Sequence, residues 1–245
     1  MNAVQMVSEL AAGDFEEHLP EPRQFWRLPQ YPRMAISVAK AENMQNLRRK
    51  FVLWGMARAM NQFITNGRFE AAIFELVWRG VNVGSILFLG GTPGLDTEPT
   101  LGNVTGNMTE TTNATSTSVT LDNLTWDFEL FGDQLGLQSI SMGAIGALIE
   151  AAEHTAHNFD HFVGSFGPDS AIWVFIASAR PTSFSKSLLV ASINAAVRYA
   201  VRHQDYRQNR FGIKLDGVEI ARGATDLFPA PPGLSAGVGT NLTTS

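Results

Sequence analysis

The stretch RFGIKLDGVEIAR, residues 210–222, decides the fold of this chain. Apolar residues alternate with polar or small ones on both sides of Asp216 and Gly217. Such alternation is typical of a strand with one buried face, and Asp-Gly is a pair that favours a two-residue hairpin turn. The sequence therefore predicts a β-hairpin whose strands span residues 211–215 and 218–222.

A second stretch, IFELVWRGVNVGS at residues 73–85, has the same design around Arg79 and Gly80. It predicts a second hairpin, with strands over residues 69–78 and 81–89. In each hairpin the apolar residues of the two strands pair on one side, so we expect that side to be buried.

Helical spacing of apolar residues precedes each hairpin, over residues 45–66 and 185–203. The two helix–hairpin units superpose without a gap when Gly80 is placed on Gly217, and we call this superposition the repeat alignment. It predicts a duplicated unit and a pseudo-symmetric domain; the alternative is that two amphipathic helices followed by hairpins align by chance. In the helices the repeat alignment carries Val52, Leu53, Met56, Met60, Phe63 and Ile64 onto Leu189, Val190, Ile193, Val197, Ala200 and Val201.

The segment between the two units predicts further strands and one more helix. Residues 124–131 alternate well enough for a strand, with residues 135–140 as its expected partner. Residues 141–163 have helical spacing, and residues 171–177 form the nearly continuous apolar run of a central strand that is covered on both faces.

These elements predict an α+β fold with an antiparallel or mixed sheet of about five to seven strands covered by three helices. Residues 1–34 contain four prolines between positions 20 and 32 and are expected to form an extended arm. Residues 35–226 form the domain, with pseudo-repeats at about 45–89 and 183–223. A Thr-, Asn- and Gly-rich insertion is expected at residues 90–123, and a mobile tail at residues 227–245.

Charge and residue content narrow the classes of function. The 245 residues include 18 Lys and Arg against 23 Asp and Glu, which gives a net charge of −5. Proteins that bind nucleic acid through phosphates need a basic face, so we expect no nucleic-acid partner. The chain has no cysteine, which excludes disulfides and thiolate metal ligands. No apolar stretch reaches the ~20 residues of a membrane-spanning helix, so we expect no membrane partner.

Two features bear on the cellular location. Residues 1–17 lack the basic and apolar regions of a signal peptide, so we expect a cytoplasmic protein. Asn-x-Thr triplets point the other way, because they accept glycans in secreted chains. They fall mostly in a Thr-rich segment where chance matches are common, and chance is the interpretation we prefer. The triplets begin at Asn103, Asn107, Asn113, Asn123 and Asn241.

The first of the paired helices is apolar almost all round. Between residues 51 and 64 it carries one charge, Arg58, and it adds Phe51 and Trp54 to the side away from its apolar stripe. A helix of this kind is buried on more than one face, either by the Pro-rich arm or by another chain. We therefore expect Phe51 and Trp54 to form an interface, together with Trp26 and Tyr31 of the arm.

One cluster has the composition of a metal site. Glu150, His154, His157 and His161 are spaced by four, three and four residues, which places them on one stripe of the expected helix. Carboxylate and imidazole are zinc ligands, so a zinc cofactor is a candidate. The alternative is that these residues are simply the hydrated side of the helix, because the stripe lies opposite its apolar face.

Catalytic motifs give no stronger lead. The glycine-rich segments match neither phosphate-binding fingerprint, and the chain has no G-x-S-x-G elbow. Asp127 and Glu129 share one face of a strand, as an acid pair would, but the exposed side of a strand has the same pattern. We expect a non-enzymatic interaction or self-assembly protein that binds a protein partner or its own copies. The alternative is a small-molecule-binding protein or enzyme with a pocket lined by Trp78, Trp126, Trp173, Met56 and Met60.

Overall fold

A computed structural model describes most of the chain and confirms the α+β class. It contains four helices, and all of its strand pairings are antiparallel within the described residues. The described residues are 2–27, 34–42, 47–67, 71–90, 109–113, 116–121, 123–166, 170–178 and 183–226. The helices are α1 (Asn2–Ala11), α2 (Arg49–Asn66), α3 (Leu137–Glu153) and α4 (Lys186–His203).

The smaller main sheet comes from the first part of the chain and has the strand order β1-β2-β4-β3. Its inner face carries buried side chains such as Trp26, Ile36 and Ile86. Residues on one face of a strand recur with period two, and Ile36 is aligned with Trp26 and with Phe88 in the neighbouring strands. The strands are β1 (Arg23–Arg27), β2 (Met34–Lys40), β3 (Ala72–Trp78) and β4 (Val81–Gly90).

The larger sheet comes from the second part of the chain and has the order β5-β6-β7-β12-β13-β10-β9. Trp126, Trp173 and Phe211 are buried on its inner face. The strands are β5 (Thr109–Asn113), β6 (Ser116–Leu121), β7 (Leu124–Gln134), β9 (His161–Gly164), β10 (Ile172–Ala177), β12 (Arg207–Leu215) and β13 (Val218–Asp226). A separate short pair joins β8 (Asn158–Phe159) to β11 (Phe184–Ser185).

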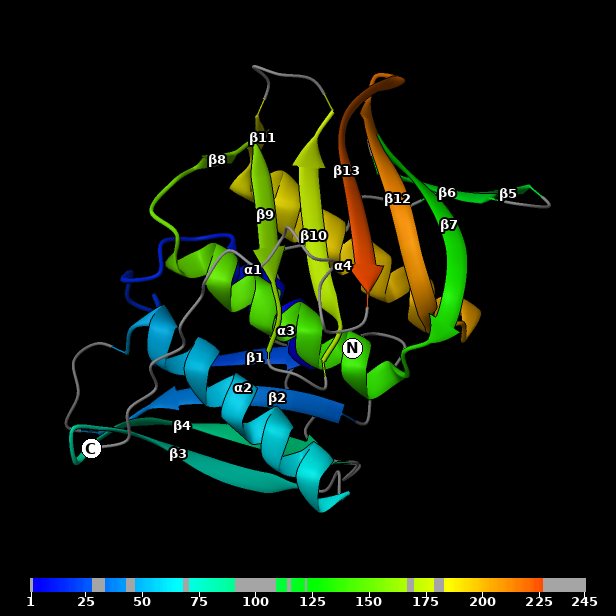
Figure 1. The fold of residues 1–245 in the computed structure, drawn as a ribbon. Helices are drawn as coiled ribbons and strands as arrows, with labels where there is room; N and C mark the ends of the chain where they lie inside the picture. Colours follow the sequence, from blue (N-terminus) through cyan, green and yellow to red (C-terminus); the bar gives the residue numbers. More distant parts are fainter. Residues whose placement is uncertain are drawn as a thin grey trace.

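The helices lie between the two main sheets, which Figure 1 shows below and above them. Helices α1 and α2 pack on the smaller sheet, whereas α3 and α4 pack on strands of the larger one. Helices α1 and α3 meet at the centre, and each of them also contacts both α2 and α4. The core is therefore a double layer of helices closed by a sheet on each side.

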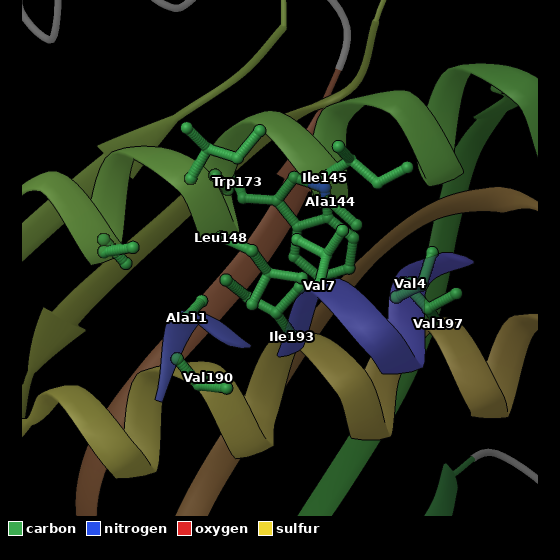
Figure 2. Close-up of a cluster of buried hydrophobic side chains, with 14 of the residues drawn as sticks. Val4, Val7, Ala11, Ala144, Ile145, Leu148, Trp173, Val190, Ile193 and Val197 are labelled. Atoms are coloured by element: carbon green, nitrogen blue, oxygen red, sulfur yellow. The ribbon is translucent and has the colours of Figure 1, made fainter. Parts of the chain in front are cut away.

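The core is densest where α1 enters between α3 and α4. Figure 2 shows Val7 of α1 beside Ile145 and Leu148 of α3, with Ile193 of α4 on the other side. All four side chains are fully buried. Helix α3 reaches the sheet closely because it carries glycine: a Cβ on Gly143 would lie 2.0 Å from the carbonyl oxygen of Ala171.

The two helix–hairpin units have matching bounds in the repeat alignment. Helix α2 falls on α4 from the first residue to the last, and each helix ends at a residue in the left-handed conformation, Gly67 or Gln204. Every aligned pair between β3 and β4 recurs between β12 and β13, and every pair that joins β13 to β10 recurs between β4 and β2.

The turns of the two hairpins follow the same rule. Arg79 and Gly80 have φ values of 50° and 78°, and Asp216 and Gly217 have 51° and 79°. Two consecutive positive φ angles define the turn that matches the right-handed twist of a hairpin, and glycine adopts this conformation without a steric penalty. The Asp-Gly and Arg-Gly signals thus fix both the position and the loop length of the hairpins.

The middle of the chain differs from the sequence-based prediction. Residues 135–140 do not form a strand, because α3 begins at Leu137. The helix predicted over 141–163 ends at Glu153, where His154 takes an extended conformation (φ −66°, ψ 126°). Phe159 and Val163 continue the helical spacing by coincidence, but they lie on β8 and β9, where Phe159 packs against Phe162.

The N-terminal prediction is also corrected. Residues 1–34 are not an extended arm throughout: α1 is a core helix, and the residues Arg23–Arg27 form β1 of the smaller sheet. The four prolines of this region all follow α1 in sequence, so they do not interrupt that helix. Proline is also compatible with a strand at a sheet edge, such as β1. The expected insertion at 90–123 contains β5 and β6, and the expected tail at 227–245 lies outside the described residues.

The strand predicted over residues 171–177 is β10, but it is not covered on both faces. Trp173 and Phe175 point into the core and are fully buried, whereas Ile176 is 49% exposed on the outer face. The run is apolar because one face of β10 is deeply buried and the outer face also carries apolar side chains such as Ile176.

The central packing predicts a large difference between two identical substitutions. Ile145→Ala removes a fully buried side chain of α3, so we expect a loss of about 2–5 kcal/mol in the free energy of unfolding. Ile176→Ala, on the outer face of β10, is the matched control because that side chain is 49% exposed, and it should cost about 1 kcal/mol or less. Urea titration followed by circular dichroism measures both, and equal losses would contradict this assignment of the core.

Candidate functional site

Four aromatic side chains meet at the N-terminal end of α2, and we call them the aromatic cluster: Phe15, Phe51, Trp54 and Trp78. The rings of Trp54 and Trp78 are nearly parallel, with centroids 5.8 Å apart. Phe15 meets Trp54 edge-on at 5.4 Å, and Phe51 lies 5.3 Å from Trp78. The cluster joins three parts of the chain and stays partly exposed, with Trp78 41% accessible.

The segment before β1 fixes the cluster by capping α2. Helix α2 begins after Arg48 without a side-chain cap, so its first N–H groups need other acceptors. The backbone N–H of Arg49 donates to the carbonyl of Glu17 at 2.9 Å, and that of Lys50 donates to Phe15 at 3.1 Å. Glu16 pairs with both Arg48 and Lys50, at 2.6 and 2.7 Å. These bonds hold the ring of Phe15 against Trp54.

One carboxylate of α3 bonds to the cluster, and a second lies one helical turn before it. The indole N–H of Trp54 donates to Glu153 at 2.8 Å, which links α2 to the end of α3. Glu150 lies one turn earlier and is half-buried. Its burial, together with the negative charge of Glu153, raises the pKa of Glu150 from 4.5 to about 7.

Exposed apolar side chains continue from the cluster along β3 and its turn. We call Ile73, Val77, Trp78 and Val81 the β3 surface; their exposed fractions run from 41% to 69%. Ile73 and Val77 lie on the outer face of the sheet, and Trp78 and Val81 flank the turn on the face of the aromatic cluster. In the repeat alignment, Ile73 and Val77 correspond to Arg210 and Lys214 on the larger sheet. There Lys214 pairs with Asp127 at 2.6 Å, and Arg210 lies over the ring of Phe131. The same positions are thus charged and paired on one sheet but apolar and exposed on the other.

The structure places the expected interface residues in different environments. Phe51 and Trp54 belong to the aromatic cluster and are half-buried, partly by Phe15. Trp26 is 6% exposed and donates its indole N–H to Glu9 of α1 at 2.6 Å, so it is a core residue. Tyr31 lies outside the described residues.

The residues expected to bind a metal do not share a helix face. Glu150 is on α3, His154 follows the helix end, His157 precedes β8, and His161 is on β9. His154 packs against the ring of Phe159, and His161 is paired with Asp160 at 2.8 Å. Across the described residues, no group of three or more His, Asp or Glu side chains is placed to hold a metal ion.

The aromatic and Met residues considered for a pocket mostly fill the core. Trp126, Trp173 and Met56 are completely buried, and the indole N–H of Trp126 donates to Ser192 of α4 at 2.9 Å. Met60 packs against the same core from a partly buried position. Trp78 is the most exposed of this set, at 41%, and belongs to the aromatic cluster.

Two cations at the helix junctions were missed by the sequence analysis. Lys186, the first residue of α4, is buried and donates to the carbonyl of His154 at the end of α3 at 2.7 Å. Burial lowers the pKa of Lys186. Its counterpart in the repeat alignment is Arg49, which begins α2 and donates to the carbonyl of Leu10 near the end of α1 at 3.4 Å. A Lys or Arg at a helix start carries no sequence signal for this role.

Asp127 and Glu129, which were considered as an acid pair, lie on the outer face of β7. Asp127 is ion-paired with Lys214, and Glu129 is aligned with Arg210 of β12. This arrangement is that of an exposed strand face that carries compensating charges.

The comparisons give no family for this chain. No protein-family model, curated protein or solved structure matches it. None of the helices in the described ranges is long and apolar enough to cross a membrane.

Glu150 predicts a pH dependence of stability. Because its pKa is higher in the folded chain than in the unfolded one, folding takes up a proton between pH 4.5 and about 7. The stability that Glu150 contributes is therefore present at low pH and is lost as pH rises through this interval. We expect Glu150→Gln to flatten the fall in the free energy of unfolding between pH 5 and 8. Glu75→Gln, on exposed β3, is the control; an unchanged slope in Glu150→Gln would contradict the assignment.

The buried cation predicts a second effect on stability. Lys186→Met leaves the carbonyl of His154 without its donor, so we expect a loss of about 1–3 kcal/mol. Lys214→Met breaks an exposed ion pair and should cost at most about 1 kcal/mol. Denaturant titrations of the two variants compare these losses, and a Lys186→Met protein as stable as Lys214→Met would refute the capping role.

Proposed function

We propose that this chain is a non-enzymatic protein that self-assembles through the β3 surface. The observation that carries the proposal is the difference between corresponding positions: Ile73 and Val77 are exposed and apolar, whereas Arg210 and Lys214 are charged and paired. Exposed apolar side chains occur on both faces of this sheet edge, with Ile73 and Val77 on the outer face and Trp78 and Val81 at the turn on the other. Exposed apolar patches mark interaction sites in soluble proteins.

The energy available at this surface supports the proposal. Fully burying a Val, Ile or Phe side chain contributes roughly 1.5–3 kcal/mol, and the β3 surface presents several such groups with at least two-fifths of their area in water. The adjoining aromatic cluster adds a Trp side chain, a residue type that is enriched at the centres of interfaces.

The alternative of a small-molecule pocket has less support. Trp126, Trp173 and Met56, which could have lined one, are buried among core side chains. Trp126 donates to Ser192 of α4, Trp173 lies among the core side chains of Figure 2, and Met56 belongs to the same buried cluster, so core packing accounts for all three.

We also propose that the two halves derive from one duplicated unit. The proposal is supported by an element order that recurs: a helix, two paired strands, a second helix and a hairpin. The sheet orders β1-β2-β4-β3 and β9-β10-β13-β12 correspond strand by strand. On this view the outer faces of the two sheets diverged, and one of them kept or acquired an apolar surface for a partner.

The experiment replaces the apolar side chains of the β3 surface by charged ones. An Ile73→Glu, Val77→Glu double variant replaces both outer apolar side chains by like charges, which repel each other across a twofold contact. Size-exclusion chromatography with light scattering, from low to high micromolar protein, should show the native chain as an oligomer and the variant as a monomer. The variant should keep the native circular dichroism, because both side chains are exposed.

A matched control is available on the other hairpin. Val218 is 67% exposed and corresponds to Val81 in the repeat alignment. Val218→Lys should leave the oligomer intact. A native chain that remains monomeric at high micromolar concentration would contradict the proposed self-assembly.

A further inference from the structure

The edge of β3 differs from its counterpart in the larger sheet. Strand β12 corresponds to β3, and its outer edge is paired along nine aligned positions with β7. Strand β3 ends the smaller sheet, with β4 as its only neighbour among the described strands. Within the described part of the chain, the position that β7 fills beside β12 is therefore open beside β3.

The open edge offers backbone groups in a regular row. In a two-residue hairpin the residues that flank the turn exchange hydrogen bonds, so the N–H and C=O of Trp78 face β4. Backbone groups alternate along an antiparallel strand, which directs those of Ile73, Glu75 and Val77 to the free edge. The bulge in this hairpin lies on β4 at Val83 and does not interrupt the alternation in β3.

Proteins usually protect such an edge, and β3 carries little protection. Edge strands are commonly blocked by proline, by lysine, or by a charge that points inward. The sequence of β3, AIFELVW, contains only Glu75 as a charged residue and has no proline. Apolar side chains lie on both of its faces, with Phe74 and Leu76 inside and Ile73 and Val77 outside.

The side chains also indicate what would pair there. On β12 the outer residues Arg210 and Lys214 match Glu129 and Asp127 of β7, so that edge selects an acidic partner face. At β3 the corresponding outer residues Ile73 and Val77 are apolar, so a matching strand would present apolar side chains to them. Strand β3 itself presents apolar side chains on both faces, with Glu75 as its one outer charge.

Resting on the self-assembly proposed above, we infer that the occupant of this edge is β3 of a second copy. The two strands pair antiparallel across a twofold axis and join two four-stranded sheets into one continuous sheet. A twofold contact is self-complementary, so a register with Ile73 opposite Ile73, or with Val77 opposite Val77, pairs apolar outer side chains of the two copies and staggers the two Glu75 residues. Registers that place the two Glu75 residues opposite each other are disfavoured by like-charge repulsion.

The first test changes the backbone and keeps the side chain apolar. Val77→Pro removes an N–H that faces the free edge, and proline is tolerated at that position of an edge strand. We expect the variant to keep the native circular dichroism and melting temperature but to weaken dimerisation at least tenfold in analytical ultracentrifugation. Lys214→Pro is the matched control, because the corresponding N–H of β12 points toward the paired strand β7 and not toward a free edge. This variant should lower the melting temperature.

The second test does not depend on a proline being tolerated. The chain has no cysteine, so single cysteines can be placed at positions 73, 75 and 77, alone and mixed in pairs. A disulfide requires Cα atoms within about 7 Å. In an antiparallel pairing, residue i of one copy lies opposite residue j of the other, and i + j is the same for every opposite pair. All cysteine pairs that cross-link between copies should therefore have one common sum. Val218→Cys, on the other hairpin, should not cross-link.

The outcomes separate this inference from the self-assembly proposal. Cross-linking with one fixed sum, together with dimers weakened by Val77→Pro, supports pairing of β3 with β3. Native oligomers that resist Val77→Pro and do not cross-link would overturn the strand pairing while self-assembly stands. A native chain that is monomeric under all conditions would overturn both.

Discussion

The fold depends on the burial of α1 between α3 and α4. Val4, Val7 and Ala11 of this ten-residue helix meet apolar side chains of both other helices, and all three are almost inaccessible to water. A helix this short is not stable alone in water, so its structure comes from the surface that it buries. Because α1 begins the first half and α3 and α4 belong to the second, the same contact that orders α1 also joins the two halves.

Around this contact, each half of the chain has the same kind of junction between its two helices. A cation at the start of the second helix donates to carbonyl groups at the end of the first, as Arg49 does for α1 and Lys186 for α3. A hairpin with two positive φ angles then follows each second helix. The halves diverge where these constraints end, on the outer faces of the sheets. Charged pairs such as Lys214 and Asp127 cover one face, while Ile73 and Val77 leave the other apolar.

Local signals explain which parts of the fold could be predicted. The hairpins at 79–80 and 216–217 and the helices before them were foreseen because turn chemistry and apolar spacing specify them within a short window. Helix α1 was missed because the prolines that indicated an extended arm all lie after this helix in the sequence. The end of α3 was missed because Phe159 and Val163 continue its spacing although they lie on strands. Of the expected interface, Phe51 and Trp54 lie in a surface cluster, but no local pattern could show that Trp26 bonds to Glu9 or that Val77 is exposed.

The way the halves are joined has a consequence for the continuity of the chain. The covalent connection between them passes through residues 91–108, whereas the packing that unites them is made by α1, α2, α3 and α4. A polypeptide cut within that connection keeps every helix contact of the core. The two fragments, produced separately and mixed, should therefore find each other and refold as a non-covalent complex, and the chain should accept new termini there.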